Sequence, residues 1–235
     1  MTEVPATGVL DNVVFKSLTG PHAWLAQRQG QAVRYPADVC GFAALPDRPQ
    51  QRDWNDLARL ANRPEGVALA GADDGPPTGW ITLSRFTVVQ MVDDGVDGRP
   101  DAEAARLMPD DVLEMLDLVG RTEPGPFGPR TIEMGTYLGF RHAGRLIAMA
   151  GQRFRPPGWT EVSAVCTAPE FRGRGLATRL VHAVVHEIRQ RGDSPFLHVV
   201  ASNTKTIALY EALGFRARRA ADVLIIRPQS VATVT

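Results

Sequence analysis

Apolar residues recur with helical spacing in two segments, residues 107–121 and 176–192. Spacings of three and four residues place such side chains on one face of a helix, so each segment is predicted to form an amphipathic helix. Gly192 is expected to end the second helix. The residues of the two apolar faces are Val112, Leu113, Leu116, Val119, Ala177, Val181, Val184, Val185 and Ile188.

Short apolar and β-branched runs around these helices predict strands. We expect a hairpin over residues 136–154, strands at 160–167 and 195–201, a helix over 204–214 and a final pair of strands. The order is helix, three antiparallel strands, helix, strand, helix, strand pair. It predicts an α/β fold of the α+β type, in which helices flank a mixed, mostly antiparallel sheet.

The first 80 residues are less regular, although they are rich in apolar side chains. Strands are expected at residues 31–35 and 66–71, with a helix capped by Asp53 between them. We therefore predict a small N-terminal α/β subdomain. The predicted divisions are an accessory subdomain over 1–84, the main domain over 85–228 and a flexible tail over 229–235.

Composition and charge exclude several classes of protein. Among 235 residues, 44% are hydrophobic and 22% are charged, which is typical of a packed globular chain. The 26 basic and 26 acidic residues balance, which argues against nucleic-acid binding through a broad basic surface. The sequence contains no apolar run of the roughly 20 residues that span a membrane and no signal peptide at its start, so we expect a cytoplasmic protein without membrane contact.

Cysteine and histidine spacing gives no metal site. Cys40 and Cys166 lie far apart, without the C-x-x-C spacing typical of metal binding. His182 and His186 stand four residues apart on the predicted helix, but a zinc site needs a third ligand. We expect these two histidines to be a solvated pair, and no bound metal.

The segment from Arg172 to Thr178 joins a strand to a helix through a glycine-rich turn. Gly173 and Gly175 let the backbone approach an anion closely, and the first N–H groups of the helix point toward it. A Walker loop is absent, and a dinucleotide fingerprint is disfavoured because Thr178 occupies its third glycine position. The alternative without a ligand is a tight turn carrying two solvated arginines.

The sequence PEFRGRGLATRL resembles the pyrophosphate-binding motif of the GCN5-related N-acetyltransferase (GNAT) superfamily, Arg/Gln-x-x-Gly-x-Gly/Ala. The later stretch ASNTKTIALYEALGF is similar to a second signature of that superfamily. The resemblance is closest to the FR47-like branch and covers roughly residues 85–228. It implies that coenzyme A contacts Val165, Cys166, Thr167, Arg172, Gly173, Arg174, Gly175, Leu176, Ala177, Thr178 and Asn203.

The resemblance also implies a reaction. Acetyl-CoA is the expected donor and an unidentified primary amine the acceptor, with direct transfer in a ternary complex and no metal. One alternative is a catalytically silent acyl-CoA-binding sensor or interaction module. A nucleotide-dependent oxidoreductase is disfavoured by the missing third glycine. The acceptor remains open between small molecules and proteins, and the chain is expected to be a monomer or a homodimer.

Four residues are candidates for catalysis. In the family, a tyrosine at the position of Tyr210 lies near the departing sulfur, so Tyr210 is the expected general acid. Period-two alternation places Glu161 on the same strand face as Val165, which favours it slightly over His198 as the general base. Cys166 has no paired base in the sequence, and a covalent role for it is disfavoured.

The N-terminal region is expected to pack near the acceptor side of the site. There it would shape the amine pocket together with the Pro/Gly-rich loop 123–129, as a degenerate half-copy of the transferase fold. The alternative is a module for stability or interaction away from the site. The acidic loop Asp93–Glu103 is a candidate for attracting a cationic acceptor.

Overall fold

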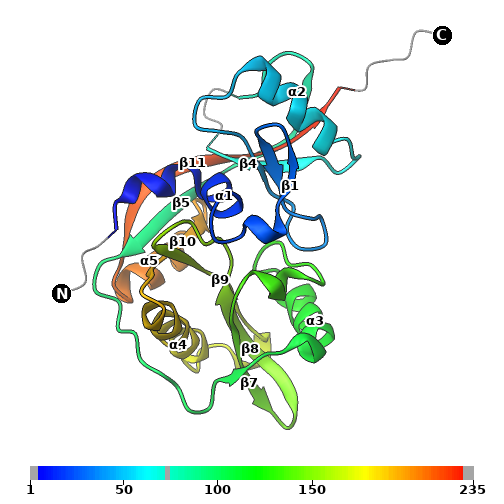
Figure 1. Cartoon of the computed structure of the whole chain (residues 1–235). Helices are drawn as coiled ribbons and strands as arrows, with labels where there is room; N and C mark the ends of the chain where they lie inside the picture. Colours follow the sequence, from blue (N-terminus) through cyan, green and yellow to red (C-terminus); the bar gives the residue numbers. More distant parts are fainter. Residues whose placement is uncertain (1–4, 72–74, 230–235) are drawn as a thin grey trace.

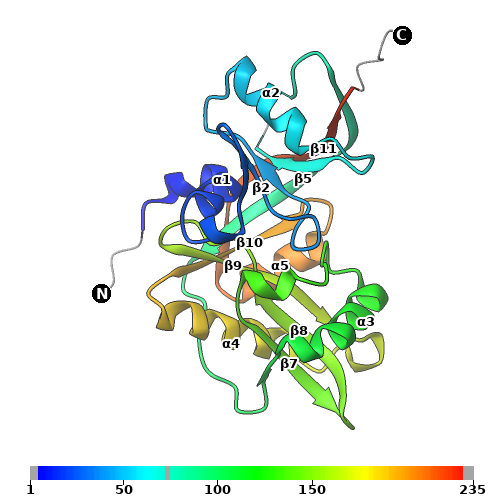
Figure 2. The same ribbon diagram turned by 45° about the vertical axis from the view of Figure 1, so that its right-hand side comes forward.

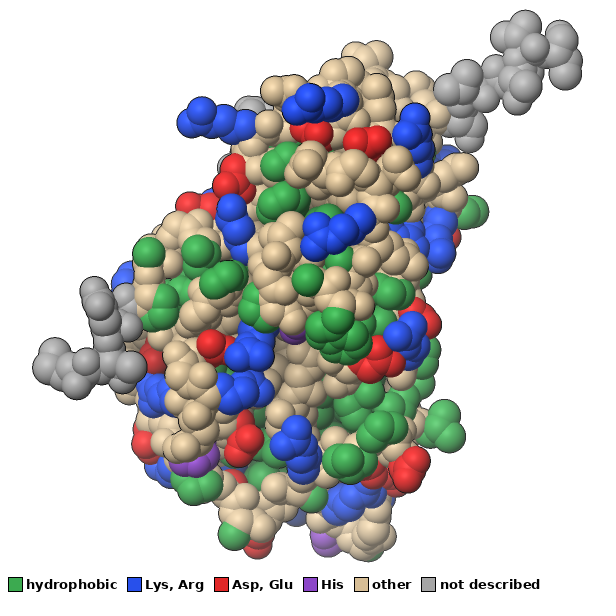
Figure 3. Space-filling model, viewed as in Figure 1, with side chains coloured by type: hydrophobic (Ala, Val, Ile, Leu, Met, Phe, Trp, Pro, Cys, Tyr) green, Lys and Arg blue, Asp and Glu red, His purple; other side chains and the backbone are tan. Residues whose placement is uncertain are grey.

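The computed structural model describes residues 5–71 and 75–229, which form a large sheet, a small sheet and the helices packed on them (Figure 1). The expected tail, residues 229–235, lies outside the described residues except for Gln229. Charged side chains of both signs are interspersed on the face in Figure 3, and apolar side chains gather at its lower right.

Among the described residues, the large sheet has eight strands, and only one neighbouring pair, β9 with β10, is parallel. The mixed, mostly antiparallel sheet expected from the sequence is therefore confirmed. In spatial order the strands are β4 (Val67–Ala70), β11 (Phe215–Pro228), β5 (Trp80–Asp93), β10 (Ser194–Val200), β9 (Trp159–Thr167), β8 (Arg145–Gln152), β7 (Tyr137–His142) and β6 (Ala105–Arg106).

The two predicted amphipathic helices cover this sheet. Helix α4 (Leu176–Gln190) packs on strands β7 to β10, and its predicted apolar face is largely buried. Helix α3 (Val112–Thr122) packs on β8 and β9 but is rotated from the predicted face, because Met115 and Leu118 are buried while Leu113 is 80% exposed. A shorter helix, α5 (Thr204–Ala212), contacts β11.

The N-terminal region forms a three-stranded sheet with short helices. Its strands are β1 (Gln27–Gln29), β2 (Ala32–Arg34) and β3 (Ala43–Ala44), and its helices are η1 (Thr7–Asn12), α1 (Val13–Leu18), η2 (Ala23–Leu25) and α2 (Gln51–Leu60). Asp53 caps α2 from inside the helix, because its carboxylate accepts a 2.8 Å hydrogen bond from the Gln50 backbone N–H.

The two parts of the chain share one sheet and one core. Strand β4 pairs with β11, and β5 crosses the expected division between residues 84 and 85. Val13 and Phe42 belong to the same buried cluster as Phe154 and Phe196. Figure 2 shows α1, β2 and α2 stacked along the upper part of β5 and β11. A division at residue 84 therefore cuts through a central strand.

Within the described part of the chain, no helix combines the length and apolar character needed to cross a membrane.

Candidate active site

Strands β9 and β10 diverge soon after they meet. They pair only from Ser194 opposite Trp159 to Phe196 opposite Glu161, and beyond that point β10 continues to pair with β5 alone. Residues 162–165 and 198–200 line a cavity of about 600 Å³ at the divergence. A second cavity of about 440 Å³ adjoins it. Both are lined by Thr122, Val165, Arg172, Thr206 and Tyr210.

The glycine-rich turn forms one wall of the smaller cavity. Gly173 and Gly175 have φ angles of 75° and 74°, and a Cβ at either position would meet no atom within 4 Å. The first bond that closes α4 runs from the Arg179 N–H to the Gly175 carbonyl, at 3.1 Å. The N–H groups of residues 176–178 precede it, have no partner within the helix and lie where this cavity begins.

This donor set suits a phosphate group. Free helical N–H groups and the positive end of the helix dipole both favour an anion. Arg172 lines both cavities, and its Nε donates to the Thr167 carbonyl at 3.3 Å. The exposed Arg174 guanidinium lies 4.8 Å from the centre of the Phe171 ring and is not part of either cavity wall. The turn therefore offers one wall arginine, Arg172, together with its backbone donors.

A bulge in β9 changes which side chains reach the larger cavity. Met149 of β8 lies opposite Cys166 and Gly151 opposite Ser163, so β9 carries one extra residue, and Ala164 has φ 52°. An extra residue reverses the alternation of faces. The expectation that Glu161 and Val165 share a face is therefore wrong. Residues 162–165 line the cavity in succession, and Glu161 is not among the lining residues.

The backbone donors of β9 follow from the pairing with β8. The Ala168 N–H donates to the Ile147 carbonyl at 2.8 Å. Antiparallel alternation therefore directs the Cys166 N–H toward β8 and the N–H groups of Val165 and Thr167 away from β8, toward the gap between β9 and β10. Of the three expected donors, Val165 and Thr167 keep that role as a prediction. Burial raises the pKa of the Cys166 thiol, which argues further against a nucleophile there.

Glu161 is fully buried and its oxygens are engaged. The Nε and Nη2 atoms of Arg153 donate to its two carboxylate oxygens at 2.7 Å each, and the Phe154 N–H donates to Oε2 at 3.3 Å. Burial alone would raise the pKa of Glu161. The charge and hydrogen bonds of Arg153, followed by those of His198, lower it to about 2. A carboxylate held in this way is a poor proton acceptor, so the preference for Glu161 as general base is corrected.

The Glu161 carboxylate is expected to make the free energy of unfolding decrease at low pH. Its folded pKa lies below the unfolded value of about 4.3, so its contribution of roughly 3 kcal/mol is present above that value and is lost as the pH falls toward 2. Urea unfolding across this range measures the loss. Glu161→Gln should show a shallower decline than the wild type, and an unchanged slope would contradict the assignment.

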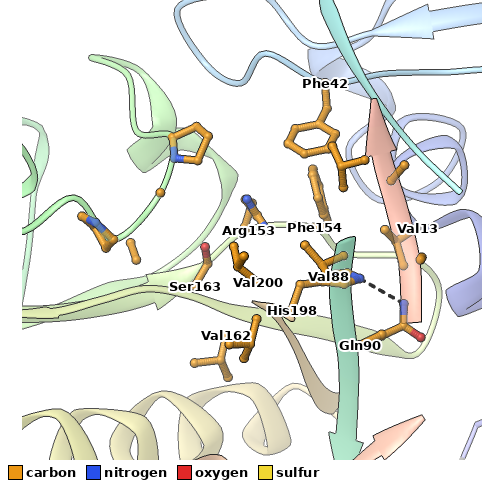
Figure 4. A pocket seen from close by; sticks show the side chains of 18 of the residues that line it. Val13, Phe42, Val88, Gln90, Arg153, Phe154, Val162, Ser163, His198 and Val200 are labelled. Atoms are coloured by element: carbon orange, nitrogen blue, oxygen red, sulfur yellow. Dashed lines mark hydrogen bonds between the residues drawn. The ribbon is translucent and has the colours of Figure 1, made fainter. Parts of the chain in front are cut away.

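His198 lines the larger cavity, and its two ring nitrogens have different partners. Nδ1 lies 2.7 Å from Glu161 Oε1, and Nε2 lies 3.1 Å from Gln90 Nε2 (Figure 4). Gln90 Oε1 accepts from Arg218 at 2.8 Å, which identifies its Nε2 as a donor. The network therefore assigns the proton of the neutral imidazole to Nδ1 and the lone pair to Nε2.

Sequence reasoning missed Gln90 and Arg153. A polar Gln90 within the β-branched run TVVQMV was the available signal, because such a residue is buried only with partners. Arg153 follows the apolar strand β8 directly, but its pairing with Glu161 depends on the register of β8 and β9.

The expected second signature occupies α5. Asn203 precedes the helix, and its Oδ1 accepts from the Thr206 N–H at 3.2 Å, so its capping role is confirmed. Tyr210 lines both cavities, its ring packs edge-on against Phe215, and burial raises the pKa of its hydroxyl. Within the described residues, no group forms a hydrogen bond to this hydroxyl. Tyr210 is therefore free to bond a ligand atom where the cavities meet.

Comparison with known proteins agrees with this geometry. The family model described as FR47-like protein matches residues 137–223. A crystal structure assigned as an acetyltransferase of the GNAT family, from Novosphingobium aromaticivorans DSM 12444, is 39% identical with a TM-score of 0.86. The match covers 94% of this chain and 98% of that one. The chain belongs to the GNAT family.

Curated relatives match a shorter part of this GNAT protein. Mycothiol acetyltransferase of Thermobispora bispora is 40% identical over 94 residues, which cover 40% of this chain and 30% of that protein. N-alpha-acetyltransferase RimI of Mycobacterium tuberculosis is 34% identical over 83 residues, covering 34% of this chain and 51% of that one. The matched segments thus span about a third to a half of these relatives.

Other charged features of the GNAT protein lie away from the cavities. The acidic loop is held on α4, where Arg179 binds Asp101 at 2.7 Å and Arg189 binds Asp93 at 2.6 Å. Asp93, Asp101 and Glu103 of this loop are neutralised there, which argues against attraction of a cationic acceptor. His182 is buried rather than solvated, and burial lowers its pKa. Residues 5–71 and 75–229 contain no cluster of three side chains able to ligate a metal.

Proposed function

We propose that this GNAT protein transfers an acetyl group from acetyl-CoA to a primary amine by direct attack in a ternary complex. One observation carries the proposal: two adjoining cavities meet at the divergence of β9 and β10. The smaller one begins at the glycine-rich turn, and the larger one holds His198. The names of the relatives, each an acetyltransferase, support the same reaction.

The donor end needs a phosphate site and a polarised carbonyl. The N–H groups of residues 176–178 and the Arg172 guanidinium would bind the pyrophosphate of coenzyme A. The N–H groups of Val165 and Thr167 would then face the acetyl carbonyl and stabilise the charge that develops on its oxygen. Loss of one such donor typically costs about 3 kcal/mol of transition-state stabilisation.

The acceptor end needs a base, because an amine attacks only after its ammonium has lost a proton. The lone pair of His198 lies on Nε2, which faces Gln90 at the cavity wall, and Glu161 binds the proton on Nδ1. Glu161 is therefore a positioning residue, since it acts through the imidazole and would stabilise the cation that forms. Gln90 must release Nε2 when the amine binds.

The leaving thiolate needs a proton, which we assign to Tyr210. Tyr210→Phe keeps the ring packed against Phe215 and removes only the hydroxyl. We expect kcat to fall by roughly a hundredfold. The acetyl-CoA affinity should stay close to that of the wild type in calorimetry. A kcat equal to that of the wild type would contradict the assignment.

One observation favours a second candidate, a silent acyl-CoA sensor. The Gln90 amide occupies the lone pair of His198, which blocks proton transfer while that bond persists. Release of free thiol from acetyl-CoA across a panel of amines decides between the two. Release with any amine supports the enzyme. Acetyl-CoA binding without release from any amine supports the sensor.

The N-terminal region contributes to the proposed acceptor pocket. Residues 10–14, 42, 70 and 71 line the larger cavity together with Thr122 at the end of α3 and residues 123–126 of the loop that follows. This arrangement supports the expected pocket-shaping role over a remote interaction module. Its origin as a half-copy of the transferase fold stays a prediction.

A further inference from the structure

We infer that the acceptor is a small primary amine carried on an apolar body, and that the larger cavity disfavours polyamines and other polycations. This inference rests on the proposed acetyl transfer and specifies its substrate class. It follows from three properties of the larger cavity: its size, the apolar side chains that line about half of it and the pairing of its charges.

Apolar side chains from both parts of the chain line about half of the larger cavity, alongside polar ones such as Asn12, Ser163 and Thr206. Figure 4 shows apolar side chains of both parts facing one another around the cavity. A volume of about 600 Å³ lies in the usual range for small-molecule sites. The labelled apolar side chains are Val13, Phe42, Val88, Phe154, Val162 and Val200.

The charged side chains at these walls already have partners, both the buried Arg153 and the half-exposed Asp11. The Arg153 guanidinium forms two bonds to Glu161 and lies 4.6 Å from the centre of the Phe154 ring. Asp11 accepts from Arg218 at 2.7 Å and from Arg219 at 3.1 Å. Neither carboxylate therefore offers a free charge to a substrate cation.

Glu123 is the remaining lining carboxylate, and it is exposed to solvent beside the Pro/Gly-rich loop. An exposed carboxylate binds a cation weakly because water screens it. A polyamine would have to bury its second ammonium in a cavity whose described lining holds no buried, unpaired carboxylate, which is costly without a partner. An apolar amine instead loses only the one charge that His198 removes.

Phe86 offers a test at the wall. It lies on β5, lines the cavity and is 37% exposed, so its replacement does not open the core. Leu83 on the same strand is 43% exposed and does not line the cavity. Phe86→Asp and Leu83→Asp therefore form a matched pair, in which only the first places a charge at the proposed acceptor site.

Two amines are compared, phenethylamine and spermidine. Thiol release is measured for each amine in the presence of acetyl-CoA, and calorimetric binding of each amine is measured in the presence of coenzyme A. We expect wild-type kcat/KM for phenethylamine to exceed that for spermidine by at least about tenfold. Phe86→Asp should lower the phenethylamine value by at least about tenfold, mainly through KM. Leu83→Asp should match the wild type.

The outcomes separate the two proposals. Preference for spermidine, or equal effects of the two substitutions, overturns the inferred substrate class while acetyl transfer stands. Phenethylamine that binds in calorimetry but is never acetylated supports the class and defeats the proposed reaction. Phenethylamine that neither binds nor reacts overturns the class.

Discussion

His198→Ala is expected to lower kcat by roughly a hundredfold to ten-thousandfold, the usual contribution of a general base. The lone pair on Nε2 of the His198 imidazole, on the side of the ring away from Glu161, is the proposed proton acceptor. Alanine removes the imidazole without adding charge. Acetyl-CoA affinity should change little, because the glycine-rich turn lines the other cavity. Steady-state rates and calorimetry measure the two effects.

His198→Gln provides the control for position. Its amide can still hydrogen bond to Glu161 but cannot take up a proton at neutral pH, so it should be nearly as inactive as the alanine variant. Thermal unfolding establishes that both variants are folded. Wild-type turnover in either folded variant would exclude His198 as the base.

Gly175→Glu is expected to weaken acetyl-CoA binding by at least about a hundredfold. Gly175 has φ 74° and open space where its Cβ would stand, so a glutamate would place a negative charge beside the free N–H groups of α4. Charge repulsion and loss of the close backbone approach act together there. Calorimetry with coenzyme A measures the affinity.

Gly192→Glu is the matched control for backbone strain. Gly192 follows the other end of α4, has φ 78° and also has open space at its Cβ position. The same residue in the same conformation should cost similar stability but leave coenzyme A affinity unchanged. Equal affinity in the two variants would remove the glycine-rich turn from the donor site.

The local features of the donor site were predictable from the sequence. Gly173, Gly175 and the start of α4 are determined by neighbouring residues, and the strand–turn–helix order is a short-range pattern. The same holds for Asn203, whose capping of α5 needs only the backbone three residues later. Such features depend little on the rest of the fold.

The choice of base was not predictable in this way. Period-two alternation assigned Glu161 to the cavity, and the bulge at Ala164 reversed it. A bulge depends on how two strands pair, so β9 alone does not reveal it. The partners of His198 come from residues 90 and 161, which only the tertiary fold brings together.

The sharing of one sheet and one core by the two parts of the chain was not predictable for a related reason. Composition suggested a break near residue 80, where a loop follows an apolar strand. Strand β4 nevertheless pairs with β11, and Phe42 packs edge-on against Phe154 at 5.2 Å. Sequence periodicity reports which residues are buried, but not which distant segment buries them.

The position of β5 between β10 and β11 has a consequence for synthesis on the ribosome. Arg85 of β5 binds Asp222 of β11, 137 residues later in the chain, and all of β10 also follows β5 by a long interval. The centre of the sheet therefore cannot close until β11, residues 215–228, has emerged. Until then β5 has two unpaired edges, which makes the nascent chain a candidate for chaperone binding and slow final folding.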